Sequence, residues 1–149
     1  MKKLILLFAC VSLLVSCDVD DDPNLVLVPA EVVDIDLPDS FEQGKSYLLE
    51  VSYLLPNACH TPSGLQVTRG SETGEERRDI YVVGVAAVEE GFDCTLPDNN
   101  LETYGSFRII IDEDDPFTFY LWTGVDENDE AIYTQVVVPV GATQTPVED

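Results

Sequence analysis

The chain has 149 residues, of which 29 are acidic and seven are basic, so its formal charge at pH 7 is −22. A surface of that sign repels nucleic acids and anionic lipid surfaces, and we therefore expect no nucleic-acid partner. The length suits a single domain, and no segment after the first 16 residues has the run of about 20 apolar residues that crosses a membrane.

The N-terminus has the layout of a secretory signal peptide. Lys2 and Lys3 form a short positive region, and the segment 4–15 is apolar apart from Ser12. As a helix, its 12 residues would reach roughly 18 Å, which is short of a hydrocarbon core of about 30 Å. We therefore expect residues 1–16 to be a cleaved signal peptide rather than a transmembrane anchor.

The residues around the expected cut, Leu14-Val15-Ser16-Cys17, resemble a lipobox, the processing motif of bacterial lipoproteins. The resemblance implies that the Cys17 thiol carries a diacylglyceryl group and that the peptidase cuts just before Cys17. Two or three acyl chains on this residue would anchor the protein stably in a membrane. The alternative is an ordinary secreted protein in which Cys17 occurs by chance.

An acidic run, Asp18-Val19-Asp20-Asp21-Asp22, follows and predicts a hydrophilic tether over residues 17–23. The run resembles the export signal that follows the lipidated cysteine in Bacteroidetes-type lipoproteins. That resemblance implies an outer-membrane lipoprotein on the cell-surface face. A plain spacer, with the protein on the periplasmic face, is the alternative.

From residue 24 to residue 140, short apolar or alternating segments are separated by turns, and no segment has a convincing helical period. Phe117, Phe119 and Leu121 share one strand face, Val33 and Ile35 share another, and a proline ends the first strand. The expected strands are 25–28, 32–37, 47–53, 65–68, 80–88, 107–111, 117–122 and 132–138. We expect residues 141–149 to form a flexible tail.

This pattern predicts an all-β fold, an immunoglobulin-like antiparallel β-sandwich of about seven to eight strands. Trp122 follows both Cys59 and Cys94, so the Cys…Trp…Cys spacing of a true immunoglobulin domain is absent. A jelly roll or a small barrel is the alternative. The segment 117–140 also resembles the closing hairpin of small β-sandwich lipoproteins of uncharacterised role.

Cysteine usage predicts one disulfide. Assigning Cys17 to lipid leaves Cys59 and Cys94 after the signal peptide, and an exported chain meets oxidising conditions. Closing this loop would stabilise the fold by roughly 3–4 kcal/mol through chain entropy. A metal site that includes His60 is the alternative, but Cys59 and His60 are adjacent and would point to opposite faces of a strand.

The sequence offers few groups for catalysis. His60 is the one histidine, and it adjoins the expected disulfide. Neither a G-x-S-x-G elbow nor a phosphate-binding glycine loop occurs. The carboxylates that a glycosidase would need lie in turns, where solvation explains them. We therefore expect no catalytic residues and no cofactor.

One acidic turn is a calcium candidate. Asp126, Asn128 and Glu130 alternate as oxygen ligands do in calcium loops, but the glycine of the D-x-[DN]-x-[DN]-G pattern is lacking. We interpret the turn as a solvated surface and predict no metal, with bound calcium as the alternative.

Aromatic residues provide a candidate binding surface. Tyr120 and Trp122 share the strand face opposite Phe117 and Phe119, and Tyr133 is expected across the hairpin. An exposed cluster of this kind stacks on sugar rings or on a partner protein. The alternative is that these rings belong to the core.

Together these features predict a lipid-anchored, non-enzymatic β-sandwich outside the cytoplasm, which serves as an interaction or accessory module of the cell envelope. Its expected partners are the membrane, through the lipid, and a protein or a glycan. The alternatives are a surface carbohydrate-binding lipoprotein that uses Tyr120, Trp122 and Tyr133, and a small hydrolase.

Overall fold

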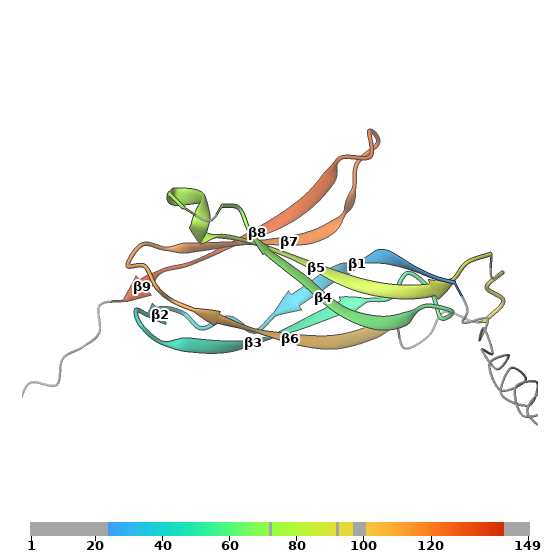
Figure 1. Ribbon diagram of the computed structural model, residues 1–149, viewed down its shortest axis with the longest axis horizontal. Helices are drawn as coiled ribbons and strands as arrows, with labels where there is room; N and C mark the ends of the chain where they lie inside the picture. The colour runs from blue at the N-terminus through green and yellow to red at the C-terminus, as the bar shows by residue number, and fades with distance from the viewer. Residues whose placement is uncertain (1–23, 72, 92, 97–100, 142–149) are drawn as a thin grey trace, which may run out of the picture.

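The computed structural model describes residues 24–71, 73–91, 93–96 and 101–141 (Figure 1). The predicted signal peptide and tether, and the part of the predicted tail from residue 142 onward, lie outside these ranges. The described elements are β1 (Leu25–Ile35), β2 (Phe41–Glu42), β3 (Ser46–Leu54), β4 (Thr61–Arg69), the 3₁₀ turn η1 (Glu75–Arg78), β5 (Asp79–Glu89), β6 (Glu102–Ile110), β7 (Phe117–Val125), β8 (Ala131–Val138) and β9 (Val140–Gly141).

The strands form two layers that share β1. The order in the larger sheet is β6-β3-β1-β5-β7-β8, and β4 pairs with β5 outside this path. The first half of β1 pairs with β5, and the second half, from Glu31 onward, pairs with β3. Because β1 passes from one layer into the other, the sheet folds over on itself, and β3 and β6 lie below β5 and β7 in Figure 1. A separate short sheet pairs β2 with β9.

The all-β class is confirmed, but the seven-stranded sheet is mixed rather than antiparallel throughout. Of the seven strand pairings in the described residues, five are antiparallel, while β5–β7 and β2–β9 are parallel. A parallel pair needs a long crossover connection. After β5 the chain crosses into the other layer as β6 and returns as β7, which supplies that crossover.

A proline does not end the first strand, contrary to the prediction. Pro29 lies inside β1 and pairs with Val85 of β5. Proline lacks the N–H that a ladder on both sides would need, so it is tolerated where one strand edge is unpaired. Pairing of β1 with β3 begins only at Glu31, so Pro29 has β5 on one side and no ladder partner on the other.

A β-bulge changes the face of one residue in β1. The register with β3 shifts between Val32 and Asp34, which leaves Val33 as the extra residue. Val32 and Ile35 are buried, whereas Val33 is 43% exposed. The prediction that Val33 and Ile35 share one face is therefore wrong, because strict alternation does not survive a bulge.

The core lies between the two layers. Phe117, Phe119 and Leu121 all point inward and are buried, which confirms the predicted alternation in β7. Phe41 of the short strand β2 is fully buried, and its ring centroid lies 4.8 Å from that of Tyr47 and 6.0 Å from that of Phe117. Each large side chain buried in this way contributes about 1.5–3 kcal/mol, so the short β2–β9 sheet is held mainly by Phe41.

A second, smaller buried cluster lies where β1 changes layers. It contains Ala30, Tyr53 and Ala86. Gly84 of β5 lets the Tyr53 ring pack directly on the backbone, since an added Cβ would lie 2.6 Å from that ring and 2.8 Å from the Ala30 carbonyl oxygen. The close approach of β1, β3 and β5 therefore requires glycine at this position.

Candidate functional site

Three tyrosines cluster on the outer face of β5, β7 and β8. The rings of Tyr81 and Tyr120 stack with centroids 4.6 Å apart, and Tyr133 meets them edge-on at 5.5 Å and 6.4 Å. Each is half-buried. The structure thus brings together two of the three predicted ligand-binding residues, Tyr120 and Tyr133.

Trp122, the third predicted residue, does not stack with the three tyrosines. It pairs in register with Tyr133, but the described residues show no ring contact between them. Its side chain instead lines a hollow with Pro29, Leu54 and Leu101, beside the point where β1 changes layers.

Sequence reasoning missed Tyr81. The segment 80–88 looked apolar throughout, and only the alternation of buried Ile80 and Val82 places Tyr81 on the outer face. Its partner in the parallel pairing is Tyr120. Burial, followed by the neighbouring Tyr120 and Asp79, raises the pKa of the Tyr81 hydroxyl above its ordinary value.

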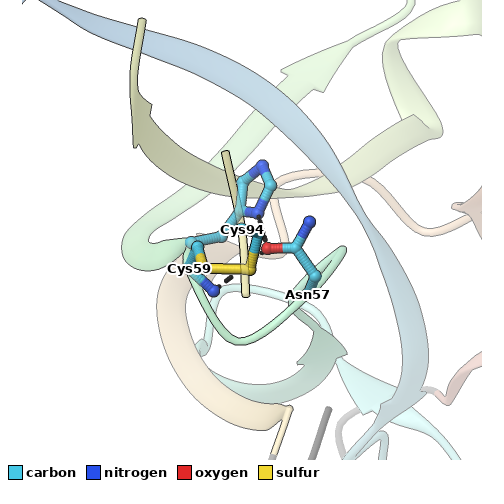
Figure 2. Close-up of a disulfide and its surroundings, with 4 residues drawn as sticks. Asn57, Cys59 and Cys94 are labelled. Atoms are coloured by element: carbon cyan, nitrogen blue, oxygen red, sulfur yellow. Dashed lines mark hydrogen bonds between the residues drawn. A yellow bond between two sulfur atoms is a disulfide. The ribbon is translucent and has the colours of Figure 1, made fainter. Parts of the chain in front are cut away.

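The predicted disulfide is present. Cys59 and Cys94 are bonded with their Cα atoms 5.7 Å apart, and the bond joins the loop after β3 to the segment after β5 (Figure 2). Asn57 organises the first loop, because its side-chain oxygen accepts hydrogen bonds from the Cys59 backbone N–H (3.0 Å) and from His60 Nδ1 (2.8 Å). His60 therefore has a local partner in this loop, and no described carboxylate bonds to its ring.

The calcium candidates form a hydrogen-bonded turn between β7 and β8. Asp126 Oδ1 accepts the backbone N–H groups of Asn128 (2.8 Å) and Glu130 (2.9 Å). These bonds, that from Glu130 first, lower the pKa of the Asp126 carboxyl below its ordinary value. Asp129 takes a left-handed conformation with φ of 62°, which completes the reversal. One carboxylate of the candidate set therefore has a structural role in the turn.

In the described ranges, including this turn, no group of three or more histidine, cysteine, aspartate or glutamate side chains is placed to hold a metal ion. Cys17, the expected lipidation site, lies outside the described residues. Within those same residues, no helix has the length and apolar character needed to cross a membrane.

Three arginines form ion pairs with the acidic turn between β6 and β7, and we call them the arginine clamp. They are Arg69, Arg77 and Arg78. The Arg69 guanidinium also donates to the carbonyl of Ile110 (3.3 Å) and lies 5.9 Å from the centre of the Phe117 ring. The ion pairs are Arg69–Asp112 (3.5 Å), Arg77–Asp112, Arg77–Glu113 (3.6 Å), Arg78–Glu113 (3.1 Å) and Arg78–Asp115 (3.0 Å). The clamp ties the end of β4 and η1 to the start of β7, so its arginines serve the fold.

No protein family matches the chain, and no curated protein or solved structure matches it with significant similarity.

Proposed function

We propose that this protein is a lipid-anchored interaction module that works outside the cytoplasm and catalyses no reaction. The Cys59–Cys94 disulfide carries the proposal, because such bonds form and persist in oxidising compartments and are rare in the cytosol. The resemblance of Leu14-Val15-Ser16-Cys17 to a lipobox also supports it, since such a motif would attach the same chain to a membrane.

The arrangement of polar side chains favours recognition over catalysis. A nucleophile needs a base within hydrogen-bond reach, and that base needs a partner to orient it. The ring of His60 instead bonds to Asn57 beside the disulfide. The outer faces of the two layers carry groups of partly exposed side chains, such as the tyrosine cluster. Surfaces of this kind suit a protein or glycan partner.

The anchor is tested by fractionating cells that express the full chain or Cys17→Ser. We expect the wild type in the outer-membrane fraction and cut before Cys17, and the variant unprocessed or released, because no acyl chain can be attached. A Cys17→Ser protein that is still membrane-held and normally cut would refute the lipid anchor.

The face of the membrane is tested by adding protease to intact cells and blotting for the protein. Digestion in unbroken cells places the module at the cell surface, where a glycan, a second cell or a host factor is its partner. Protection until lysis places it in the periplasm, where an envelope component is its partner.

Glycan binding is the second candidate, and the tyrosine cluster favours it. Tyrosine rings on an outer face stack on sugar rings at small entropic cost. On a glycan array, with and without a chelator, we expect any retained glycan to be lost in Tyr120→Ala and kept in Tyr104→Ala, which removes an exposed tyrosine of the other layer. Equal retention by all three proteins would show that the tyrosine cluster binds no glycan.

A further inference from the structure

The outer face of the β1–β3–β6 layer contains a hollow of about 550 Å³, within the range of about 300–1,000 Å³ that is usual for ligand sites. Asp34 of β1, Ser52 of β3 and Tyr104 of β6 form a row across its middle, because Ser52 pairs in register with both of the others. Further carboxylates surround this row. They are Asp36, Glu50 and Glu102.

The bulge in β1 creates part of this hollow. Because Val33 is the extra residue, Val33 and Asp34 both face outward while Val32 and Ile35 remain in the core. Bulges commonly re-aim side chains at functional sites. Here the bulge sets the apolar side chain of Val33 next to the carboxylate of Asp34 on the outward face.

The carboxylates of the acidic hollow have no ion-pair partner among the described residues. Arg108, a basic residue of the same layer, donates to Ser46 Oγ (3.3 Å) and lines a different hollow. The charge of Glu102 raises the pKa of the Tyr104 hydroxyl, with smaller contributions from desolvation, from the hydrogen bond that this hydroxyl donates to Glu102 (3.3 Å) and from the charge of Glu50. The hollow is thus a site of uncompensated negative potential.

Ser52 provides a second, independent indication of a ligand. Only 7% of the residue is exposed, yet its side chain makes no hydrogen bond within the described part of the chain and lines the hollow. Buried side-chain polar atoms without a partner are absent from the described residues, so the Ser52 hydroxyl must reach solvent through the hollow. A hydroxyl that opens into an acidic site in this way is free to accept a hydrogen bond from a donor that enters.

The composition of the lining selects an organic cation with an apolar stem. The carboxylates are not placed to converge on one metal ion. Val33 and Leu54 contribute apolar surface, and the Tyr104 ring, 62% exposed, presents a face for a cation. A guanidinium or ammonium group on a methylene chain satisfies all three features, because its head pairs with carboxylates while its stem covers apolar surface.

We propose that the acidic hollow binds an arginine or lysine side chain presented by a basic segment of a partner protein. The proposal rests on the interaction function proposed above and names the chemistry of the partner. Charge complementarity is its basis, because four carboxylates without ion pairs among the described residues line the hollow together with the Ser52 hydroxyl.

The test measures binding of a fluorescent, end-capped hexa-arginine peptide to the full chain in non-ionic detergent by anisotropy. At about 0.15 M salt the screening length is about 8 Å, so the measurement reports nearby charges rather than the total charge. We expect Asp34→Asn/Glu102→Gln to bind about fivefold to tenfold more weakly than the wild type. The matched control, Asp114→Asn/Glu127→Gln, also removes two charges, but at exposed turns outside the hollow, and should change binding by less than about twofold.

Three results would overturn the proposal. The first is no binding by the wild type. The second is equal weakening in both double variants, which would indicate a diffuse charge effect. The third is competition by spermidine as strong as by unlabelled peptide, which would identify the ligand as a free polyamine. The anchoring test with Cys17→Ser does not depend on the hollow, so failure of this proposal and failure of the proposed function can be told apart.

Discussion

The turn between β6 and β7 and the hollow on β1, β3 and β6 are both acidic, but only the turn is paired with arginines. In the turn, the arginine clamp forms five ion pairs with three carboxylates. In the acidic hollow, four carboxylates lie around Ser52 with no ion pair among the described residues. The chain has seven basic residues, and three of them serve one turn.

This difference shows that the distribution of charge is more informative than its total. A formal charge of −22 favours solubility wherever the acids lie. Acids that hold arginines contribute to the stability of the fold, whereas acids gathered without counter-ions oppose it through mutual repulsion. Carboxylates of the second kind attract cations, and this makes the hollow, rather than the turn, the region to test for a partner.

The largest expected effect comes from removing the disulfide, which joins the loop after β3 to the segment after β5. The cysteines are 35 residues apart in sequence, so Cys59→Ser/Cys94→Ser should lower the free energy of unfolding by about 3–4 kcal/mol, measured by urea denaturation. Cys59 follows β3, whose Leu54 lines the hollow, while the clamp lies at the far end of β4.

Hydrogen exchange sharpens this prediction into a comparison of the two regions. In the double variant we expect faster exchange at the end of β3 and the start of β4 than in the turn that the clamp holds. Wild-type protein treated with reductant is the matched control and should behave as the variant does. Faster exchange in the β6–β7 turn than at the end of β3 would contradict this prediction, because it would show that the disulfide stabilises both regions together.

Next in size is a pair of neutralising substitutions with opposite expected signs. Asp112→Asn breaks pairs with Arg69 and Arg77 and should destabilise the fold by about 1 kcal/mol, less at high salt. Glu102→Gln removes a charge that has no ion pair among the described residues, and an amide oxygen can still accept the Tyr104 hydrogen bond, so stability should stay unchanged or rise by a few tenths of a kcal/mol. Urea denaturation at two salt concentrations measures both.

The second substitution has a spectroscopic readout as well. Because Glu102 is the main cause of the raised pKa of Tyr104, Glu102→Gln should return that pKa toward its ordinary value, followed by nuclear magnetic resonance of the Tyr104 ring. Equal destabilisation by Asp112→Asn and Glu102→Gln would remove the distinction between clamp and hollow.

Much of the fold could be predicted from local sequence. Alternation placed Phe117, Phe119 and Leu121 in the core, and the pairing of Cys59 with Cys94 followed from the compartment that the N-terminus implies. Both inferences use neighbouring residues or simple counting. The layer change of β1 and the parallel pairing of β5 with β7 depend on contacts between distant segments, and alternation carries no information about them.

The candidate site was harder to predict for the same reason. Tyr120 and Tyr133 lie on one hairpin, so sequence alone could pair them, but Tyr81 reaches them only through the parallel pairing. The acidic hollow depends on a bulge at Val33 and on the register that sets Ser52 between β1 and β6. A bulge shifts every later residue of a strand, so it cannot be read from a pattern that assumes a period of two.

Asp126 differs from the acids of both regions, because backbone N–H groups rather than arginines bond to its carboxylate. Its substitution gives the smallest expected effect. Those N–H groups lower the pKa of the carboxyl, so the stability that they confer is fully present above the unfolded pKa of about 3.9 and is lost as the pH falls through the lower folded pKa. Asp126→Ala should therefore lower the melting temperature slightly at neutral pH, and the difference from wild type should shrink below about pH 4. Glu127→Gln, in the same turn, is the control and should show no such convergence. A difference between wild type and Asp126→Ala that stays constant across this range would mean that the turn does not depend on the ionised carboxylate, and that Asp126 belongs with the unpaired acids of the hollow.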